Sequence, residues 1–160
     1  MIEVEIEAAG WTVALTDAEN LAKIAAKQTL AAVAANDGDV VILLADDETV
    51  RGLNARFRAQ DRPTNVLSFP TADATPLVGA GRPLGDIVLA LETCKREAAE
   101  QRKSLSEHLQ HLVAHGVLHL VGYDHLNDGE AEAMEALERR ILADLGVPDP
   151  YAAREDSGRG

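Results

Sequence analysis

The chain has 160 residues, of which 46% are hydrophobic and 26% are charged, and this balance is typical of one globular domain with a substantial core. No apolar run approaches the roughly 20 residues that cross a membrane, so we expect no membrane span. The formal net charge of -12 argues against a broad affinity for nucleic acid, although an acidic body can still carry a local basic cleft.

Strands and helices alternate in the first part of the chain. Residues 2–8 alternate apolar and acidic side chains, which predicts a half-buried strand. This start has no basic region before a long apolar stretch, so we expect no secretory signal and a cytoplasmic location. Residues 16–19 match a capping box and predict a helix to about residue 35, followed by a turn at 36–38. Residues 40–44 are continuously apolar, which predicts a central strand covered on both faces.

A short helix is expected next, capped by Asp46 or Asp47 and running through Arg56. Its inward-facing residues are predicted to be Val50, Leu53 and Phe57. Residues 61–63 break the helix, and residues 66–69 form another short strand. Residues 70–84 are rich in Gly, Pro, Ala and Thr and predict a mobile surface loop, after which residues 85–90 form a fourth strand.

Helices dominate the second half. Residues 91–102 are predicted to be helical, a capping box at Ser104 and Glu107 starts the next helix, and Asn127 caps the last one, which ends at Gly146 and Pro148. The polar residues 152–160 are expected to form a disordered tail after a single domain at 1–151. The fold class is therefore predicted to be α+β, with a small mixed sheet of about four strands and five or six helices.

Cysteine and arginine usage leaves few chemical options. Cys94 is the single cysteine, which excludes an internal disulfide, and we expect it to be a buried or half-buried side chain without a nucleophilic role. Four arginines lie close together in sequence and are the candidates for a basic cleft: Arg51, Arg56, Arg58 and Arg62. On composition alone, a solvated helix face is the preferred interpretation of these four.

All five histidines lie between residues 108 and 125. His115 and His119 are one helical turn apart and share a face. Gly122 can end the helix in a left-handed conformation, so that the chain turns back and brings His125 towards that face. On spacing alone, His111 pairs with His115 equally well, but His125 would lie farther from His111 than from His119.

We therefore predict one zinc ion held by His115, His119 and His125, with the fourth position open to water. Zinc would lower the pKa of that water towards neutrality. A closed structural site would need a fourth ligand from the protein, for which Cys94 or Asp124 is available. Asp124 directly precedes His125, so we expect it to support a ligand histidine and not to bind the metal itself. The two other histidines, His108 and His111, are expected beside the ligands or at the surface.

The spacing H-x-x-x-H-x-x-G-x-x-H is also that of the metzincin zinc proteases. Those enzymes have a glutamate directly after the first histidine as their general base, whereas this chain has Gly116 at that position. A protease would therefore lack its proton acceptor.

Three segments of the chain form a combined motif. The first is H-G-V-L-H-L-V-G-Y-D-H at 115–125. The second combines L-N-A-R-F-R at 53–58 with P-T-N-V-L-S-F-P at 63–70, and the third is L-G-D-I at 84–87. Together they resemble the YbeY family of bacterial endoribonucleases, the ribosomal RNA maturation factors. Similar segments extend from the first helix to Tyr151, so the resemblance covers nearly the whole predicted domain.

This resemblance implies a zinc-dependent endoribonuclease specific for single strands, which acts in 3′-end maturation of the small-subunit ribosomal RNA and in ribosome quality control. It implies zinc on the residues matching His115, His119 and His125, and a functional arginine, here Arg58, so Arg58 and His115 are the expected catalytic residues. The expected partners are single-stranded or ribosomal RNA, the ribosome and small-subunit ribosomal proteins, with no membrane and no disulfide partner. No carboxylate has a spacing that marks a general base, although His111 could assist a proton transfer.

Two other functions stay open at this point. The first is a zinc hydrolase of peptides or of another ester or amide, against which Gly116 counts. The second is a non-catalytic ribosome-assembly factor with a structural metal, for which the net charge of -12 suits binding to basic ribosomal proteins.

Overall fold

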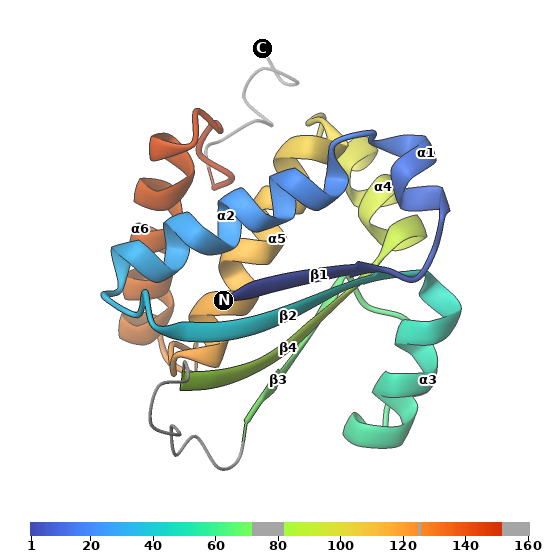
Figure 1. Cartoon of the computed structure of the whole chain (residues 1–160), viewed down its shortest axis with the longest axis horizontal. Coiled ribbons are helices and arrows are strands. Elements are labelled where there is room, and N and C mark those ends of the chain that lie inside the picture. The colour runs from blue at the N-terminus through green and yellow to red at the C-terminus, as the bar shows by residue number, and fades with distance from the viewer. Residues whose placement is uncertain (72–81, 125, 152–160) are drawn as a thin grey trace.

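The computed structural model describes residues 1–71, 82–124 and 126–151 (Figure 1). One sheet has the strand order β1-β2-β4-β3, with β1 (Ile2–Ile6), β2 (Gly38–Ala45), β3 (Val66–Pro70) and β4 (Arg82–Ala90). Strands β1, β2 and β4 run parallel, and β3 pairs antiparallel with β4 at one edge. This mixed four-stranded sheet confirms the predicted α+β fold class.

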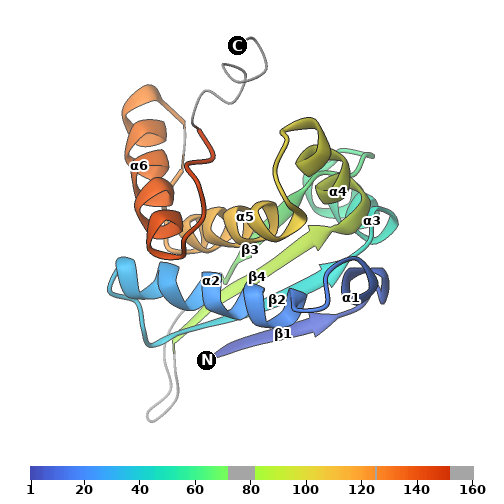
Figure 2. The ribbon, with the colours of Figure 1, turned by 90° about the horizontal axis from the view of Figure 1, so that it is seen from above.

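The described residues form six helices: α1 (Gly10–Ala14), α2 (Ala18–Ala32), α3 (Asp47–Arg58), α4 (Leu91–Glu100), α5 (Leu105–Leu120) and α6 (Asp128–Asp144). Figure 2 shows α2 and α5 side by side along one face of the sheet, with α6 beside them at one end. Helix α5 contacts α2, α4 and α6 as well as strands β3 and β4. It is therefore the helix around which the other elements pack.

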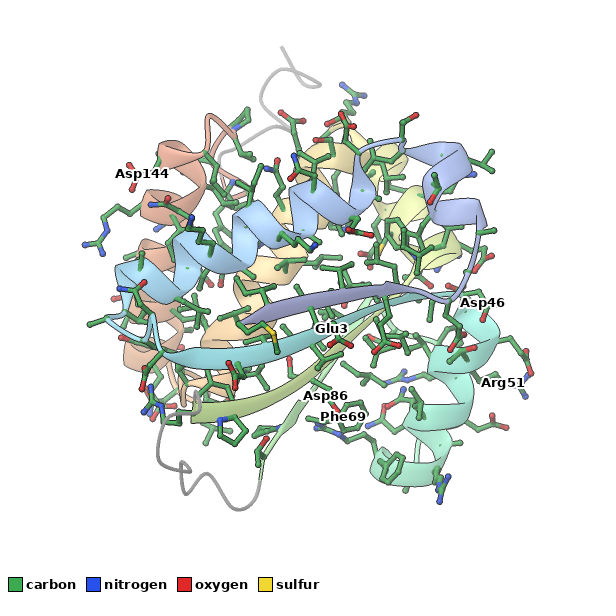
Figure 3. All side chains as sticks on the ribbon, viewed as in Figure 1. Glu3, Asp46, Arg51, Phe69, Asp86 and Asp144 are labelled. Atoms are coloured by element: carbon green, nitrogen blue, oxygen red, sulfur yellow. The ribbon has the colours of Figure 1, made fainter. Side chains whose placement is uncertain are left out.

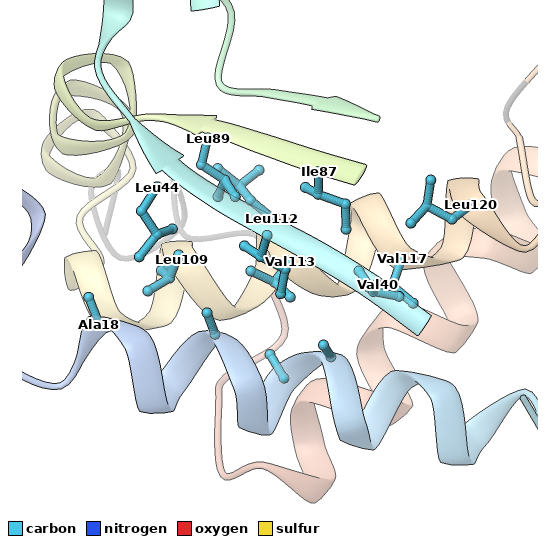
Figure 4. Packing of buried hydrophobic residues seen from close by; sticks show 14 of the residues in the cluster. Ala18, Val40, Leu44, Ile87, Leu89, Leu109, Leu112, Val113, Val117 and Leu120 are labelled. Atoms are coloured by element: carbon cyan, nitrogen blue, oxygen red, sulfur yellow. The ribbon is translucent and has the colours of Figure 1, made fainter. Parts of the chain in front are cut away.

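The position of α5 is determined by the core. Ten of its 16 residues are buried, and its apolar side chains pack against Ile87 and Leu89 of β4 and against the alanines of α2 (Figure 4). Each large apolar side chain that is fully buried in this way contributes roughly 1.5–3 kcal/mol to stability. A capping box at Ser104 and Glu107 starts α5 as predicted, because both of its reciprocal hydrogen bonds are formed.

The two faces of the sheet differ. Ile42 and Ile87 are paired in register and are fully buried beneath the helices. On the opposite face, α3 covers the end of the sheet around Val88, whereas Glu3 and Asp86 are exposed. The expectation that β2 is covered on both faces is therefore wrong for part of the strand, since its alternate residues are only half-buried.

Several element boundaries differ from the prediction. Helix α2 begins at Ala18, where Asp17 forms no capping hydrogen bond, so the predicted capping box at 16–19 is wrong. Helix α2 ends at Ala32, because Ala34 takes a positive φ of 56° within a run of alanines that carries no stop signal. Strand β4 begins at Arg82, earlier than predicted. A register shift opposite β2 interrupts the alternation of its side chains, so the sequence pattern did not indicate the first residues of the strand. Helix α1 was not predicted, since five residues are too few to show a helical period.

Other expectations about single residues can be checked directly. Asp46 caps α3 and Asn127 caps α6, each through its side chain. Cys94 is buried as predicted, and burial raises the pKa of its thiol. Phe57, predicted to face inward, is instead 55% exposed. The predicted tail at 152–160 and most of the predicted loop at 70–84 lie outside the described residues. No helix within the described ranges is long and apolar enough to cross a membrane.

Candidate functional site

Helix α5 brings His115 and His119 together. Their Nε2 atoms lie 3.1 Å apart, and their ring centroids are 4.6 Å apart. The ring centroids of His111 and His115 are 6.3 Å apart, and Nε2 of His111 is directed to a glutamate instead. Of the two pairs that spacing allowed, the structure therefore brings the nitrogens of His115 and His119 towards a common point.

The end of α5 follows the predicted glycine turn. Gly122 has a φ of +104°, in the left-handed region that disfavours other residues. Its N–H donates to the carbonyl of His119, and the N–H of Tyr123 donates to the carbonyl of Leu118, which together form a Schellman motif. The chain thus leaves the helix next to His119. His125 lies outside the described residues, so its role as the third ligand stays a prediction.

A cleft of about 670 Å³ lies between this helix end and the edge strand β3. Residues on α3, on β3 and the segment before it, and at the end of α5 line it: Arg58, Thr64, Asn65, Val66, Leu67, Ser68, Pro70, His115, His119, Gly122, Tyr123 and Asp124. The cleft therefore combines both described histidines of the predicted metal site with the predicted catalytic arginine, although these residues are far apart in sequence.

Arg58 is held at the free edge of β3. It is the last residue of α3, and its Nη2 donates to the carbonyl oxygen of Ser68 at 2.7 Å. Its guanidinium carbon also lies 5.6 Å from the ring centroid of Phe69. No carboxylate among the described residues forms an ion pair with Arg58. The surface salt bridge that would otherwise have explained Arg58 is thus not formed within the described part of the chain.

Glu138 on α6 is a buried carboxylate that sequence reasoning did not identify. Its side chain is fully buried and accepts hydrogen bonds from Nε2 of His111 at 2.6 Å, from Nδ1 of His115 at 3.2 Å and from the Tyr151 hydroxyl at 2.7 Å. Burial alone would raise the pKa of Glu138, but the hydrogen bonds and charges of His111 and His115 lower it to about 2. Glu138 is therefore a carboxylate at neutral pH.

The ionised Glu138 determines the tautomer of His115. A carboxylate only accepts hydrogen bonds, so Nδ1 of His115 must carry the proton and a neutral ring then has its lone pair on Nε2. That lone pair is directed at the point shared with His119. Two nitrogens bound to one tetrahedral zinc lie roughly 3.3–3.4 Å apart, given Zn–N distances of about 2.0–2.1 Å. The observed 3.1 Å between these nitrogens fits two ligands of such an ion.

The two remaining histidines are not surface residues. His108 is only 2% exposed and bonds to Glu97 at 2.8 Å. Burial lowers the pKa of His108 to about 4 despite this bond, so the ring is neutral at pH 7. His111 contacts Glu138 and Tyr151 and is not among the residues that line the cleft. Both were expected beside the predicted ligands or at the surface. His111 shares Glu138 with His115, whereas His108 is buried in the packing between α4 and α5, so the expectation is wrong for His108.

Within the described residues, no three His, Cys, Asp or Glu side chains are grouped as a complete metal site. The two alternative fourth ligands are far from equivalent. Cys94 is buried in the main core cluster, whereas Asp124 lines the cleft. A closed site completed by Cys94 is therefore inconsistent with the fold.

The position that is glutamate in metzincins faces away from the cleft. A Cβ atom added to Gly116 would lie 3.0–3.3 Å from three atoms of the Ile87 side chain on β4. The carbonyl oxygen of Gly116 also accepts a hydrogen bond from the Ser68 hydroxyl at 3.3 Å. A glutamate at this position would thus enter the helix–sheet interface, so the protease mechanism has no counterpart here.

Comparisons with known proteins agree with one another. A family model described as "Endoribonuclease YbeY" matches residues 4–146. Two proteins named Endoribonuclease YbeY are similar over nearly their full length: that of Paramagnetospirillum magneticum is 52% identical over 155 residues, and that of Sinorhizobium medicae is 46% identical over 160, each comparison covering 94% of both chains. A solution structure of a Thermotoga maritima protein, 24% identical, superposes with a TM-score of 0.55 and covers 100% of this chain and 99% of its own, which supports the fold.

Proposed function

Since this chain belongs to the YbeY family of endoribonucleases, we propose that it is a zinc-dependent endoribonuclease that cleaves single-stranded RNA. We further propose that its substrate is the 3′ end of the small-subunit ribosomal RNA, reached on the cytoplasmic ribosome and its small-subunit proteins. The observation that carries the proposal is the cleft that Arg58 shares with His115 and His119.

The chemistry of RNA cleavage suits these groups. The transition state at phosphorus carries additional negative charge, and a guanidinium can hold two phosphate oxygens through parallel hydrogen bonds. Arg58 would bind and orient the phosphate in this way, because Ser68 already holds its side chain at the mouth of the cleft. His115, His119 and His125 would hold the zinc ion, which supplies a Lewis acid at the phosphoryl oxygen. Glu138 would keep the Nδ1 proton on His115.

The two other functions differ in what they require. A peptide hydrolase of the metzincin type needs a general base at position 116, where Gly116 packs against Ile87. A ribosome-assembly factor with a structural metal would need neither a cleft beside the histidines nor Arg58 directed into it. Both are therefore less well supported than the nuclease.

Incubation of the zinc-loaded protein with three substrates tests the proposal. We expect cleavage of a single-stranded RNA, little cleavage of the same sequence in a duplex and no digestion of casein. His115→Ala should abolish the cleavage. If this variant and the unmodified protein cleave RNA at equal rates, a contaminating nuclease is responsible and the proposed activity is wrong.

Arg58→Ala is expected to reduce kcat/KM for single-stranded RNA by roughly 100-fold, since removing one preorganised donor from a developing oxyanion costs about that factor. The kcat/KM of Arg58→Lys should lie between those of the unmodified protein and Arg58→Ala, because lysine carries a point charge without the planar fork of hydrogen-bond donors. Arg51→Ala is the matched control: it lies on the same helix but pairs with Asp61 at the surface. Equal kcat/KM values for Arg58→Ala and Arg51→Ala would mean that Arg58 has no role in RNA cleavage.

A further inference from the structure

Both phenylalanines of the chain lie together next to the cleft. The sequence contains only two, Phe57 on α3 and Phe69 on β3, and their ring centroids are 5.6 Å apart in an edge-to-face arrangement. Phe57 is 55% exposed and Phe69 is half-buried, whereas the side chain of Trp11 is fully buried. Core packing accounts for Phe69, which packs against the cluster beneath α3, but it does not account for the exposure of Phe57.

Packing of α3 onto the sheet does not require Phe57. Val50 is fully buried against the sheet, and Leu53 joins the same cluster, which already contains Leu67 and Val88. Phe57 lies one turn beyond Leu53 and contacts the ring of Phe69 at the rim of this cluster. The last turn of α3 therefore presents an aromatic ring to solvent although the helix is anchored without it.

Arginines cover both rings. The guanidinium carbon of Arg56 lies 5.1 Å from the ring centroid of Phe57, and that of Arg58 lies 5.6 Å from the centroid of Phe69. Neither arginine forms an ion pair with a carboxylate of the described residues. Aromatic rings and guanidinium planes are the groups on which unpaired bases stack. We call these four residues, Arg56, Phe57, Arg58 and Phe69, the Phe–Arg cluster.

The Phe–Arg cluster is connected to the cleft through Arg58, which lines the cleft and also contacts Phe69. On its other side, the Phe–Arg cluster is flanked by carboxylates. Asp86 is paired with Phe69 in the sheet register, and Glu3 follows in the same row across β2, as Figure 3 shows along the open face. A polyanion at the cluster would be repelled from this acidic face and directed towards the cleft.

From these contacts we infer that the Phe–Arg cluster is a stacking site for an unpaired base of the RNA strand whose phosphate Arg58 binds. This inference rests on the proposed function and adds a base-binding subsite to it. A base stacks on Phe57 or on the guanidinium of Arg56 only when the base is unpaired and its face is not stacked on a neighbouring base. The subsite therefore selects single strands over duplexes without reading their sequence.

The test combines steady-state cleavage with a binding measurement. Phe57→Leu keeps an apolar side chain but removes the π face, whereas Phe57→Tyr keeps the π face. The matched control is Ile24→Ala, which changes an exposed apolar residue on α2. A single-stranded 2′-O-methyl oligonucleotide with 2-aminopurine reports stacking, because its emission falls when the base stacks. Melting temperatures establish that each variant is folded.

We expect Phe57→Leu to bind this oligonucleotide roughly tenfold more weakly and to lose the fall in 2-aminopurine emission, while Phe57→Tyr and Ile24→Ala behave as the unmodified protein. Because stacking is retained through the reaction, KM for single-stranded RNA should rise and kcat should change little. If the unmodified protein cleaves RNA but Phe57→Leu matches Ile24→Ala in both measurements, the stacking site is wrong and the nuclease stands. If the unmodified protein neither binds nor cleaves single-stranded RNA, the stacking site and the proposed nuclease activity are both wrong.

Discussion

Replacing His119 with alanine is expected to reduce RNA cleavage by roughly 1000-fold and to lower the zinc content well below one ion per chain. Nε2 of His119 lies 3.1 Å from Nε2 of His115, which is close to the spacing of two ligands on one zinc ion. A Lewis acid at phosphorus contributes several kcal/mol to transition-state stabilisation, and about 4 kcal/mol corresponds to a factor of roughly 1000.

Zinc content is measured by elemental analysis of the purified protein, together with the melting temperature with and without added zinc. Zinc should raise the melting temperature of the unmodified protein, because a ligand that binds only the folded state stabilises it. In His119→Ala this rise should be largely lost. The metal measurements do not depend on catalysis, so they test the ligand assignment separately from the nuclease activity.

His108→Gln is the matched control for His119→Ala. It removes an imidazole from the same helix, but His108 bonds to Glu97 on α4 and does not line the cleft. The control should lose stability while it retains one zinc ion and its cleavage rate. A His119→Ala protein that holds one zinc ion and cleaves RNA at the unmodified rate would show that His119 is not a ligand.

Local sequence signals predicted the helix that carries the histidines. The capping box at Ser104, the apolar periodicity of α5 and the stop at Gly122 each act within a few residues, so the pairing of His115 with His119 could be predicted from sequence alone. Local signals predicted both ends of α2 poorly, and no side chain caps this helix. At its alanine-rich end, Ala34 carries no mark of its left-handed backbone.

The surroundings of the histidines depend on tertiary contacts that no short pattern contains. Glu138 lies on another helix and is 23 residues from its partner His115. One signal was present, since a charged residue occupies the apolar stripe of α6 that Met134, Ile141 and Leu142 form. Phe57 was predicted inward from the same period as Val50. The prediction failed because Val50 and Leu53 pack in the cluster on the sheet, whereas Phe57 lies at the rim of this cluster against the ring of Phe69.

Replacing Glu138 with alanine is expected to destabilise the fold by roughly 3–5 kcal/mol, the range found when one partner of a buried charged pair is removed. The fully buried carboxylate accepts hydrogen bonds from His111, His115 and Tyr151. Alanine leaves these three donors without their acceptor and creates a cavity as well. Urea unfolding of the purified protein measures this loss.

Glu138→Gln separates the role in stability from the role at the metal. Glutamine has nearly the same volume, so the loss of stability should be much smaller than for alanine. Its amide nitrogen is a donor, and where it faces Nδ1 of His115 the ring must carry its proton on Nε2, the atom that would bind the metal. Partners of this kind typically change metal affinity by about 10–100-fold when they are replaced. A competition titration with a zinc chelator measures this affinity.

Glu97→Gln provides the comparison for Glu138→Gln, because Glu97 also bonds to a buried histidine, His108, on the same helix. It should change stability but leave zinc affinity unchanged, since His108 is directed towards α4 and not into the cleft. Equal zinc affinities for Glu138→Gln and Glu97→Gln would mean that Glu138 only packs the interior. A loss confined to Glu138→Gln would mean that α6 holds His115 in the tautomer that a metal requires.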